Sequence, residues 1–181
     1  VSILAGLMVA LKFVPEDHQL WVLPMIGVLL SIICLGLSLT PAIIASQSFI
    51  ITAALIAPLK MFVPGAEAAL PLVPIVVMLG MSHFLLHSRE LIEDKTHPLR
   101  VLGSVGTQLY FFYGWALCLV WGFKFVPDAY IFLVFSVVAI AHALAHRRRE
   151  RLERAVVAGA FALAGFIIFW AQSSPKPLDI L

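Results

Sequence analysis

Charged side chains are scarce in this 181-residue chain. They make up 12% of the residues, and apolar residues make up 62%, whereas soluble domains have about 25% and about 45–50%. The net charge is only +2, and no glycine-rich phosphate loop follows a strand pattern. These absences argue against a nucleic-acid partner and against a soluble second domain.

Cysteine and catalytic motifs are also sparse. Cys34 and Cys118 lie in separate apolar runs, towards opposite predicted membrane faces, so we expect two buried thiols and no disulfide. The sequence has no nucleophile elbow, no Ser-His-Asp set with usable spacing and no paired carboxylates inside an apolar run. This pattern favours a protein that is not an enzyme.

Long apolar runs are what the sequence does contain. A helix needs about 20 residues to cross a hydrocarbon core about 30 Å thick, and only helices satisfy the backbone of such a run in lipid. We therefore predict an all-α, polytopic transmembrane bundle of about seven helices. The predicted helices cover residues 1–13, 20–39, 41–63, 70–87, 99–126, 129–146 and 152–172. The first would span only about 20 Å, so we expect a truncated helix and a fragment of a larger protein.

A Lys-Phe-Val-Pro-acid pattern recurs between these runs. It covers residues 12–16, is expanded over 60–67, and returns at 124–128. The spacing predicts one transmembrane domain built of tandem helical hairpins. We expect hairpins at about 1–40, 41–98 and 99–150, then a helix at 151–173 and a tail at 174–181.

Basic residues separate the two sides of the predicted bundle. Because positive loops remain in the cytoplasm, the loops near residues 89–98 and 147–154 should be cytoplasmic and the proline corners should face the other side. The second loop determines topology or, alternatively, contacts anionic lipid. Its arginines are Arg147, Arg148, Arg149, Arg151 and Arg154.

The three proline corners and the arginine-rich turn 147–154, which leads into an Ala- and Gly-rich helix, carry a family resemblance. The chain resembles uncharacterised bacterial multi-pass inner-membrane proteins built of tandem helical hairpins. The resemblance implies an architecture and a location in the bacterial inner membrane. It implies no chemistry.

Four polar residues inside the predicted spans are candidate functional residues: Gln47, Thr52, Gln108 and Tyr110. Gln47 and Gln108 occupy matching positions of two repeats and could line a polar substrate path at a repeat interface. Alternatively, these side chains form interhelical hydrogen bonds. No Asp, Glu, Lys or Arg lies near the middle of a span, which argues against an ion-coupled transporter within this segment.

Two histidine pairs with a spacing of four residues close two of the predicted helices. The pairs are His83 with His87, and His142 with His146. Each pair lies on one helix face, so two such helices could supply four nitrogens to zinc or clamp a haem. Alternatively, histidines at helix ends simply reach the headgroups. We expect no bound metal, with the pairs too far apart to share a ligand.

These patterns predict a non-enzymatic membrane segment, either a structural and assembly component or a transport component of a larger membrane protein or complex. The alternative is a metal- or haem-binding membrane module that uses the histidine pairs. Its expected partners are membrane lipid and either other membrane subunits or the remainder of the parent chain.

Overall fold

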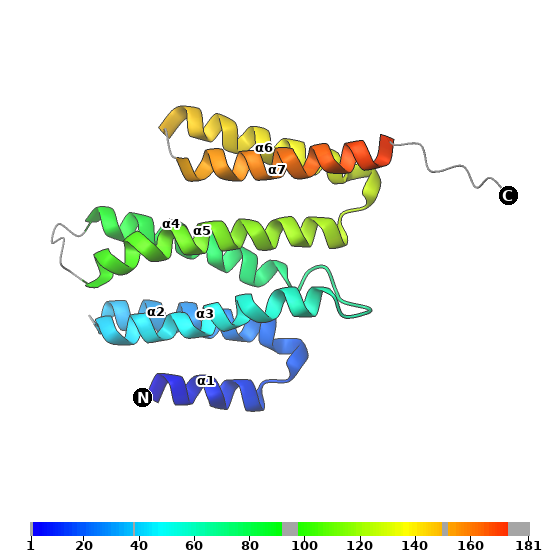
Figure 1. The fold of residues 1–181 in the computed structure, drawn as a ribbon. Coiled ribbons are helices and arrows are strands. Elements are labelled where there is room, and N and C mark those ends of the chain that lie inside the picture. Colours follow the sequence, from blue (N-terminus) through cyan, green and yellow to red (C-terminus); the bar gives the residue numbers. More distant parts are fainter. Residues whose placement is uncertain (1, 38, 92–97, 150–151, 174–181) are drawn as a thin grey trace. The chain divides into compact units, whose positions relative to one another are not determined.

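In the computed structural model, the described residues are 2–37, 39–91, 98–149 and 152–173, and all the regular elements among them are helices. Figure 1 shows their order. Each of the seven predicted helices is present, and a short 3₁₀ helix, η1, was not predicted. The elements are α1 (Ser2–Phe13), η1 (Glu16–His18), α2 (Gln19–Gly36), α3 (Thr40–Met61), α4 (Leu72–Leu91), α5 (Pro98–Phe125), α6 (Asp128–Arg149) and α7 (Leu152–Ser173).

Prolines and one glycine explain several of the boundaries. Pro41 lies in the first turn of α3, and Pro98 is the first residue of α5. A proline costs no hydrogen bond there, because the first N–H groups of a helix have no partner within it. Gly65 has a φ of 77°, a left-handed conformation that favours glycine, and it reverses the chain between α3 and α4.

Four helices are long and apolar enough to cross a membrane, which indicates a membrane protein. The candidate spans are Glu16–Leu35, Pro41–Met61, Asp128–His146 and Leu152–Gln172. A shorter apolar segment, Leu72–His87, lies in α4. The count of seven membrane crossings stays a prediction.

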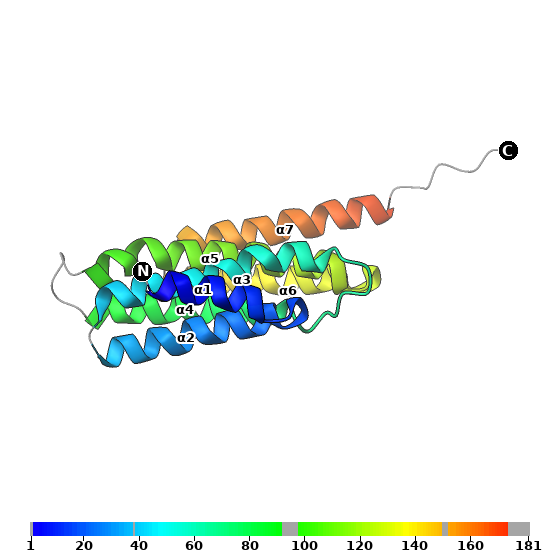
Figure 2. The same ribbon diagram turned by 90° about the horizontal axis from the view of Figure 1, so that it is seen from below.

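The chain divides into two compact units, residues 1–124 and residues 125–181. The first unit contains α1 to α5, and the second contains α6 and α7. The predicted hairpin 99–150 extends across the division, and the tandem hairpin repeat stays a prediction. Within the first unit, Figures 1 and 2 show each α-helix running antiparallel to the next one along the chain.

The centre of the first unit is the seam between α2 and α3, which pack along their lengths. The buried α3 residues of the seam recur at steps of three and four, the spacing of knobs-into-holes packing. They include Ser46, Ile50, Ala53 and Ala57. Gly27 allows the closest approach, because a Cβ added there would lie 2.6 Å from Ile50 Cγ1 and 3.2 Å from the Ile50 backbone nitrogen.

The other helices of the first unit pack around this seam. Leu7, Ala10 and Leu11 of α1 cover a cluster of Leu23, Phe49 and Ala53. Ser82 on α4 donates a hydrogen bond to the carbonyl of Thr107 on α5 (3.0 Å). These contacts join all five α-helices into one bundle.

The second unit is a helical hairpin with an aromatic centre. The rings of Phe135 on α6 and Phe161 on α7 meet edge to face, with centroids 5.3 Å apart. Near one end of the hairpin, Gln172 Nε2 donates to the carbonyl of Asp128 (3.0 Å). Near the other end, Arg154 Nη1 donates to the carbonyl of Ala145 (3.4 Å).

Candidate functional site

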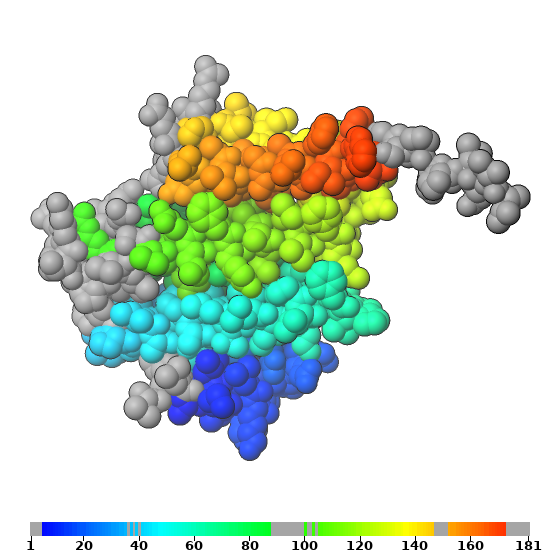
Figure 3. Space-filling model, viewed as in Figure 1, coloured from blue at the N-terminus to red at the C-terminus, as the bar shows by residue number. Residues whose placement is uncertain are grey.

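Four buried polar side chains converge where α2, α3 and α5 of the first unit meet. They are Ser31, Ser46, Gln47 and Tyr110, which we call the polar cluster. Figure 3 shows the side chains of α3 directly beside those of α5 on one face of this unit. Since lipid offers no hydrogen-bond partners, polar groups within a membrane bundle must find them in the protein.

The two serines connect α2 to α3. Ser31 Oγ donates to the carbonyl of Gly27 (2.7 Å), and Ser46 Oγ donates to the carbonyl of Ile43 (2.7 Å). Such bonds to the preceding helical turn satisfy a hydroxyl in an apolar interior. The two Oγ atoms also lie 2.8 Å apart, within hydrogen-bond distance of each other.

Gln47 extends this contact to α5. Its Nε2 donates to Ser31 Oγ (2.9 Å) and to the carbonyl of Ile43 (3.0 Å), and lies 3.3 Å from Ser46 Oγ. Its Oε1 accepts a hydrogen bond from the hydroxyl of Tyr110 (2.8 Å). Both ends of the buried amide are therefore satisfied by protein groups.

The serines and the Gln47 amide share their hydrogens among several acceptors. The two hydroxyls and the amide carry four hydrogens between them and make six donor–acceptor contacts. The contacts of the cluster join hydroxyl, amide and backbone carbonyl groups, all of them uncharged.

Gln108, the counterpart of Gln47 in the predicted repeat, does not belong to the polar cluster. Gln108 is exposed on α5, whereas Gln47 is buried and contacts Tyr110 on the same helix. Thr52 is half-buried on α3. Sequence reasoning missed Ser31, although its position four residues after Gly27 within an apolar run was an available signal.

The histidine pairs lie in different units. His83 and His87 are exposed on α4, and His142 and His146 are half-buried on α6. That the two pairs are too far apart to share a ligand stays a prediction. Among the described residues, no group of three or more His, Cys, Asp or Glu side chains could hold a metal ion.

The arginine-rich loop is only partly described. The side chains of Arg147, Arg148 and Arg149, and the whole of Arg151, lie outside the described residues. Arg154 is described, and its hydrogen bond to Ala145 joins the start of α7 to α6. Contact of the loop with lipid stays a prediction.

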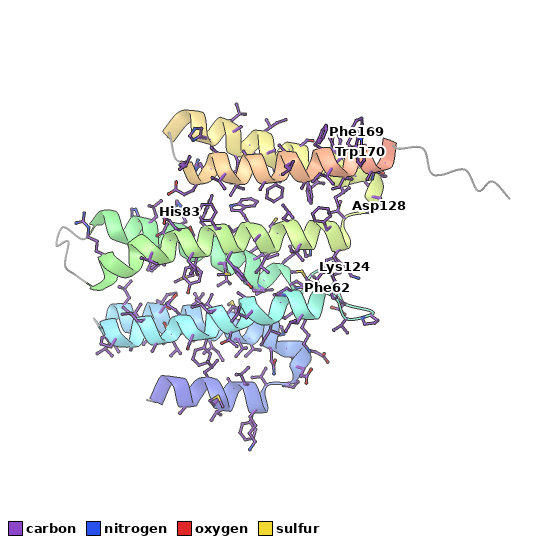
Figure 4. The ribbon with its side chains drawn as sticks, viewed as in Figure 1. Phe62, His83, Lys124, Asp128, Phe169 and Trp170 are labelled. Atoms are coloured by element: carbon purple, nitrogen blue, oxygen red, sulfur yellow. The ribbon has the colours of Figure 1, made fainter. Side chains whose placement is uncertain are left out.

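A second group of polar contacts lies at the end of the first unit that carries the loops between α1 and α2 and between α3 and α4 (Figure 1). We call it the corner end. Lys60 Nζ lies 2.8 Å from Glu16 Oε2 and joins the first two proline corners. Trp121 Nε1 donates to the carbonyl of Ala68 (2.7 Å). Figure 4 shows Lys124 beside Phe62, with Nζ 6.0 Å from the ring centroid.

Cys34 and Cys118 are free thiols. Cys34 is buried on α2 as expected, whereas Cys118, which was also expected to be buried, is only half-buried on α5. Neither belongs to the polar cluster or to the corner end.

Comparison with known proteins adds no function to this geometry. No protein-family model, curated protein or solved structure matches the chain. The interpretation of the polar cluster therefore rests on its hydrogen bonds and burial.

Proposed function

We propose that the chain is a non-enzymatic structural and assembly component of a larger membrane protein or complex in the bacterial inner membrane. The main support for this proposal is the hydrogen bonding of Gln47. Its amide nitrogen donates to Ser31 on α2 and to Ile43 on its own helix, and its oxygen accepts from Tyr110 on α5. Neither end is therefore left for a substrate. A polar group that serves a transport path must exchange its partners with water or substrate.

The composition of the seam supports the same role. Small and weakly polar residues at a membrane interface allow close helix packing, and hydrogen bonds between helices add about 0.6 kcal/mol each. Gly27, Ser31, Ser46 and Ala53 are such residues in the α2–α3 seam. The cluster thus has the composition of a helix-packing interface.

Replacing the whole polar cluster tests this function. The variant would combine Ser31→Ala, Ser46→Ala, Gln47→Leu and Tyr110→Phe. Removing all partners of a buried network together is far less costly than removing one, because no buried group remains unsatisfied. We expect this variant to insert into the membrane, to retain the native assembly mass on native gels, and to complement a deletion strain.

A transport path predicts a different result. In that case the variant would insert and assemble as the wild type does, but it would fail to complement. Tyr130→Phe is the matched control, since it removes an exposed hydroxyl outside the cluster. Loss of complementation by the cluster variant alone would overturn the structural role.

A further inference from the structure

A cleft of about 470 Å³ opens at the corner end of the first unit. It lies between η1, the start of α2, the end of α3 and the loop that precedes α4. Its polar and aromatic lining consists of Glu16, Asp17, His18, Trp21, Lys60 and Glu67. The volume falls within the range of about 300–1,000 Å³ that is usual for small-molecule sites.

The charges of this corner cleft favour a cation. The ammonium of Lys60 is already paired with Glu16, at 2.8 Å. Asp17 and Glu67 are exposed carboxylates in the same lining. Three carboxylates against one ammonium leave a formal charge of −2 with His18 neutral, so an anionic ligand would be repelled.

The rest of the lining favours an organic cation over a metal ion. Calcium needs six to eight oxygen ligands around one point, and among the described residues no three His, Cys, Asp or Glu side chains form a metal-binding group. Trp21 lines the cleft and is 43% exposed, with its ring centroid 5.7 Å from that of His18. Leu20, Leu70 and Pro71 add apolar surface. An indole face attracts an ammonium group through the ring quadrupole.

The position of the cleft determines how a ligand reaches it. One candidate span begins at Glu16 and another ends at Met61, so the cleft lies level with the ends of two spans. Both water-soluble molecules and lipid headgroups have access at this level.

We propose that the corner cleft binds a primary ammonium group, carried by a soluble amine or by an amine-bearing lipid headgroup. Asp17 and Glu67 accept its hydrogen bonds, and Trp21 forms its aromatic wall. This inference goes beyond the proposed function and does not rest on it.

Two probes separate the possible sources of the ammonium group. Ethanolamine is titrated into the detergent-solubilised protein and followed by isothermal calorimetry. Phosphatidylethanolamine and phosphatidylglycerol are added in equal amounts, and the lipid retained is measured by native mass spectrometry. Binding of ethanolamine indicates a soluble amine, and retention of phosphatidylethanolamine without ethanolamine binding indicates a lipid headgroup. Each of these two results supports the proposal.

Variants of the lining test the assignment of residues. Asp17→Asn combined with Glu67→Gln should weaken binding at least tenfold, and Trp21→Leu should weaken it several-fold. Glu153→Gln, which neutralises an acid outside the cleft, should bind as the wild type does. Circular dichroism confirms that each variant is folded. The proposal is overturned if neither amine probe binds, if phosphatidylglycerol is retained equally well, or if the double variant binds with unchanged affinity.

Discussion

The hydroxyl of Tyr110 on α5 donates a hydrogen bond to Gln47 Oε1 on α3, at 2.8 Å and across 63 positions of sequence. Both residues are almost fully buried, with 2% and 4% of their surfaces exposed. One turn further along α5, the Tyr113 hydroxyl donates to the carbonyl of Ala54 at 3.3 Å. Two tyrosines on one face of α5 therefore fix its position along α3.

Tyr110→Phe should destabilise the first unit. The substitution keeps the ring but leaves Gln47 Oε1 without its donor, and hydrogen bonds between membrane helices contribute about 0.6 kcal/mol on average and about 1.7 kcal/mol at most. We expect the free energy of unfolding, measured by SDS titration in mixed micelles, to decrease by an amount within that range. Tyr130→Phe makes the same chemical change at an exposed site and should leave the free energy of unfolding unchanged. Equal effects of the two substitutions would contradict a stabilising role for the bond.

Tyr110→Phe should stabilise the first unit instead of destabilising it when Gln47 is absent. In a Gln47→Leu background the Tyr110 hydroxyl has lost its acceptor, and a buried unsatisfied hydroxyl costs about 1–3 kcal/mol. Tyr110→Phe then removes that cost and should raise the free energy of unfolding. A double-mutant cycle over the two positions measures the change of sign. A destabilising Tyr110→Phe in both backgrounds would show that the hydroxyl stabilises the unit without its hydrogen bond to Gln47.

The helices were predictable from the sequence because apolar runs of this length have only one way to satisfy their backbone in lipid. Their pairing was not, since the faces towards lipid and towards other helices are both apolar and no stripe marks the core. The short η1 turn was missed because three residues carry no periodic signal.

The polar cluster was predictable in part. Gln47 and Tyr110 were both candidates, but the sequence related Gln47 to Gln108, its counterpart in the predicted repeat, and not to Tyr110. Residues two apart on a helix point roughly 200° from one another, because each residue turns the helix by about 100°. Once Tyr110 faces α3, Gln108 must face away, and the rotation of α5 that decides this is set by packing.

Two glycines of the first unit should respond oppositely to alanine. At Gly27 the new Cβ would lie 2.6 Å from Ile50 Cγ1 and 3.2 Å from a backbone nitrogen, so α2 and α3 must separate. Overpacking of this kind costs about 1–3 kcal/mol. At Gly80 on α4 a Cβ meets nothing within 4 Å, and the gain in helix propensity is about 1 kcal/mol.

The two alanine variants are compared by SDS titration under identical conditions. Gly27→Ala should unfold at a lower SDS fraction than the wild type, and Gly80→Ala at the same or a higher fraction. Gly114→Ala provides an intermediate case, because its Cβ meets the flexible end of Leu79 at 2.9 Å. A tolerated Gly27→Ala would show that the α2–α3 seam is looser than its geometry indicates.

The sidedness of the first unit can be measured with single cysteines. The loops that contain Pro15 and Pro64 lie at one end of the unit (Figure 1), and the charge asymmetry predicts that this end faces away from the cytoplasm. With Cys34→Ala and Cys118→Ala as background, a cysteine is placed at Ala66 or at Thr96, and intact cells are treated with an impermeant thiol reagent. We expect labelling at position 66, and labelling at position 96 only after the membrane has been permeabilised. Permeabilised cells are also the control for reactivity. Both thiols must be labelled there before a difference in their labelling in intact cells can be assigned to sidedness. Labelling of position 96 in intact cells without labelling of position 66 would invert the assignment and place the corner cleft on the cytoplasmic side.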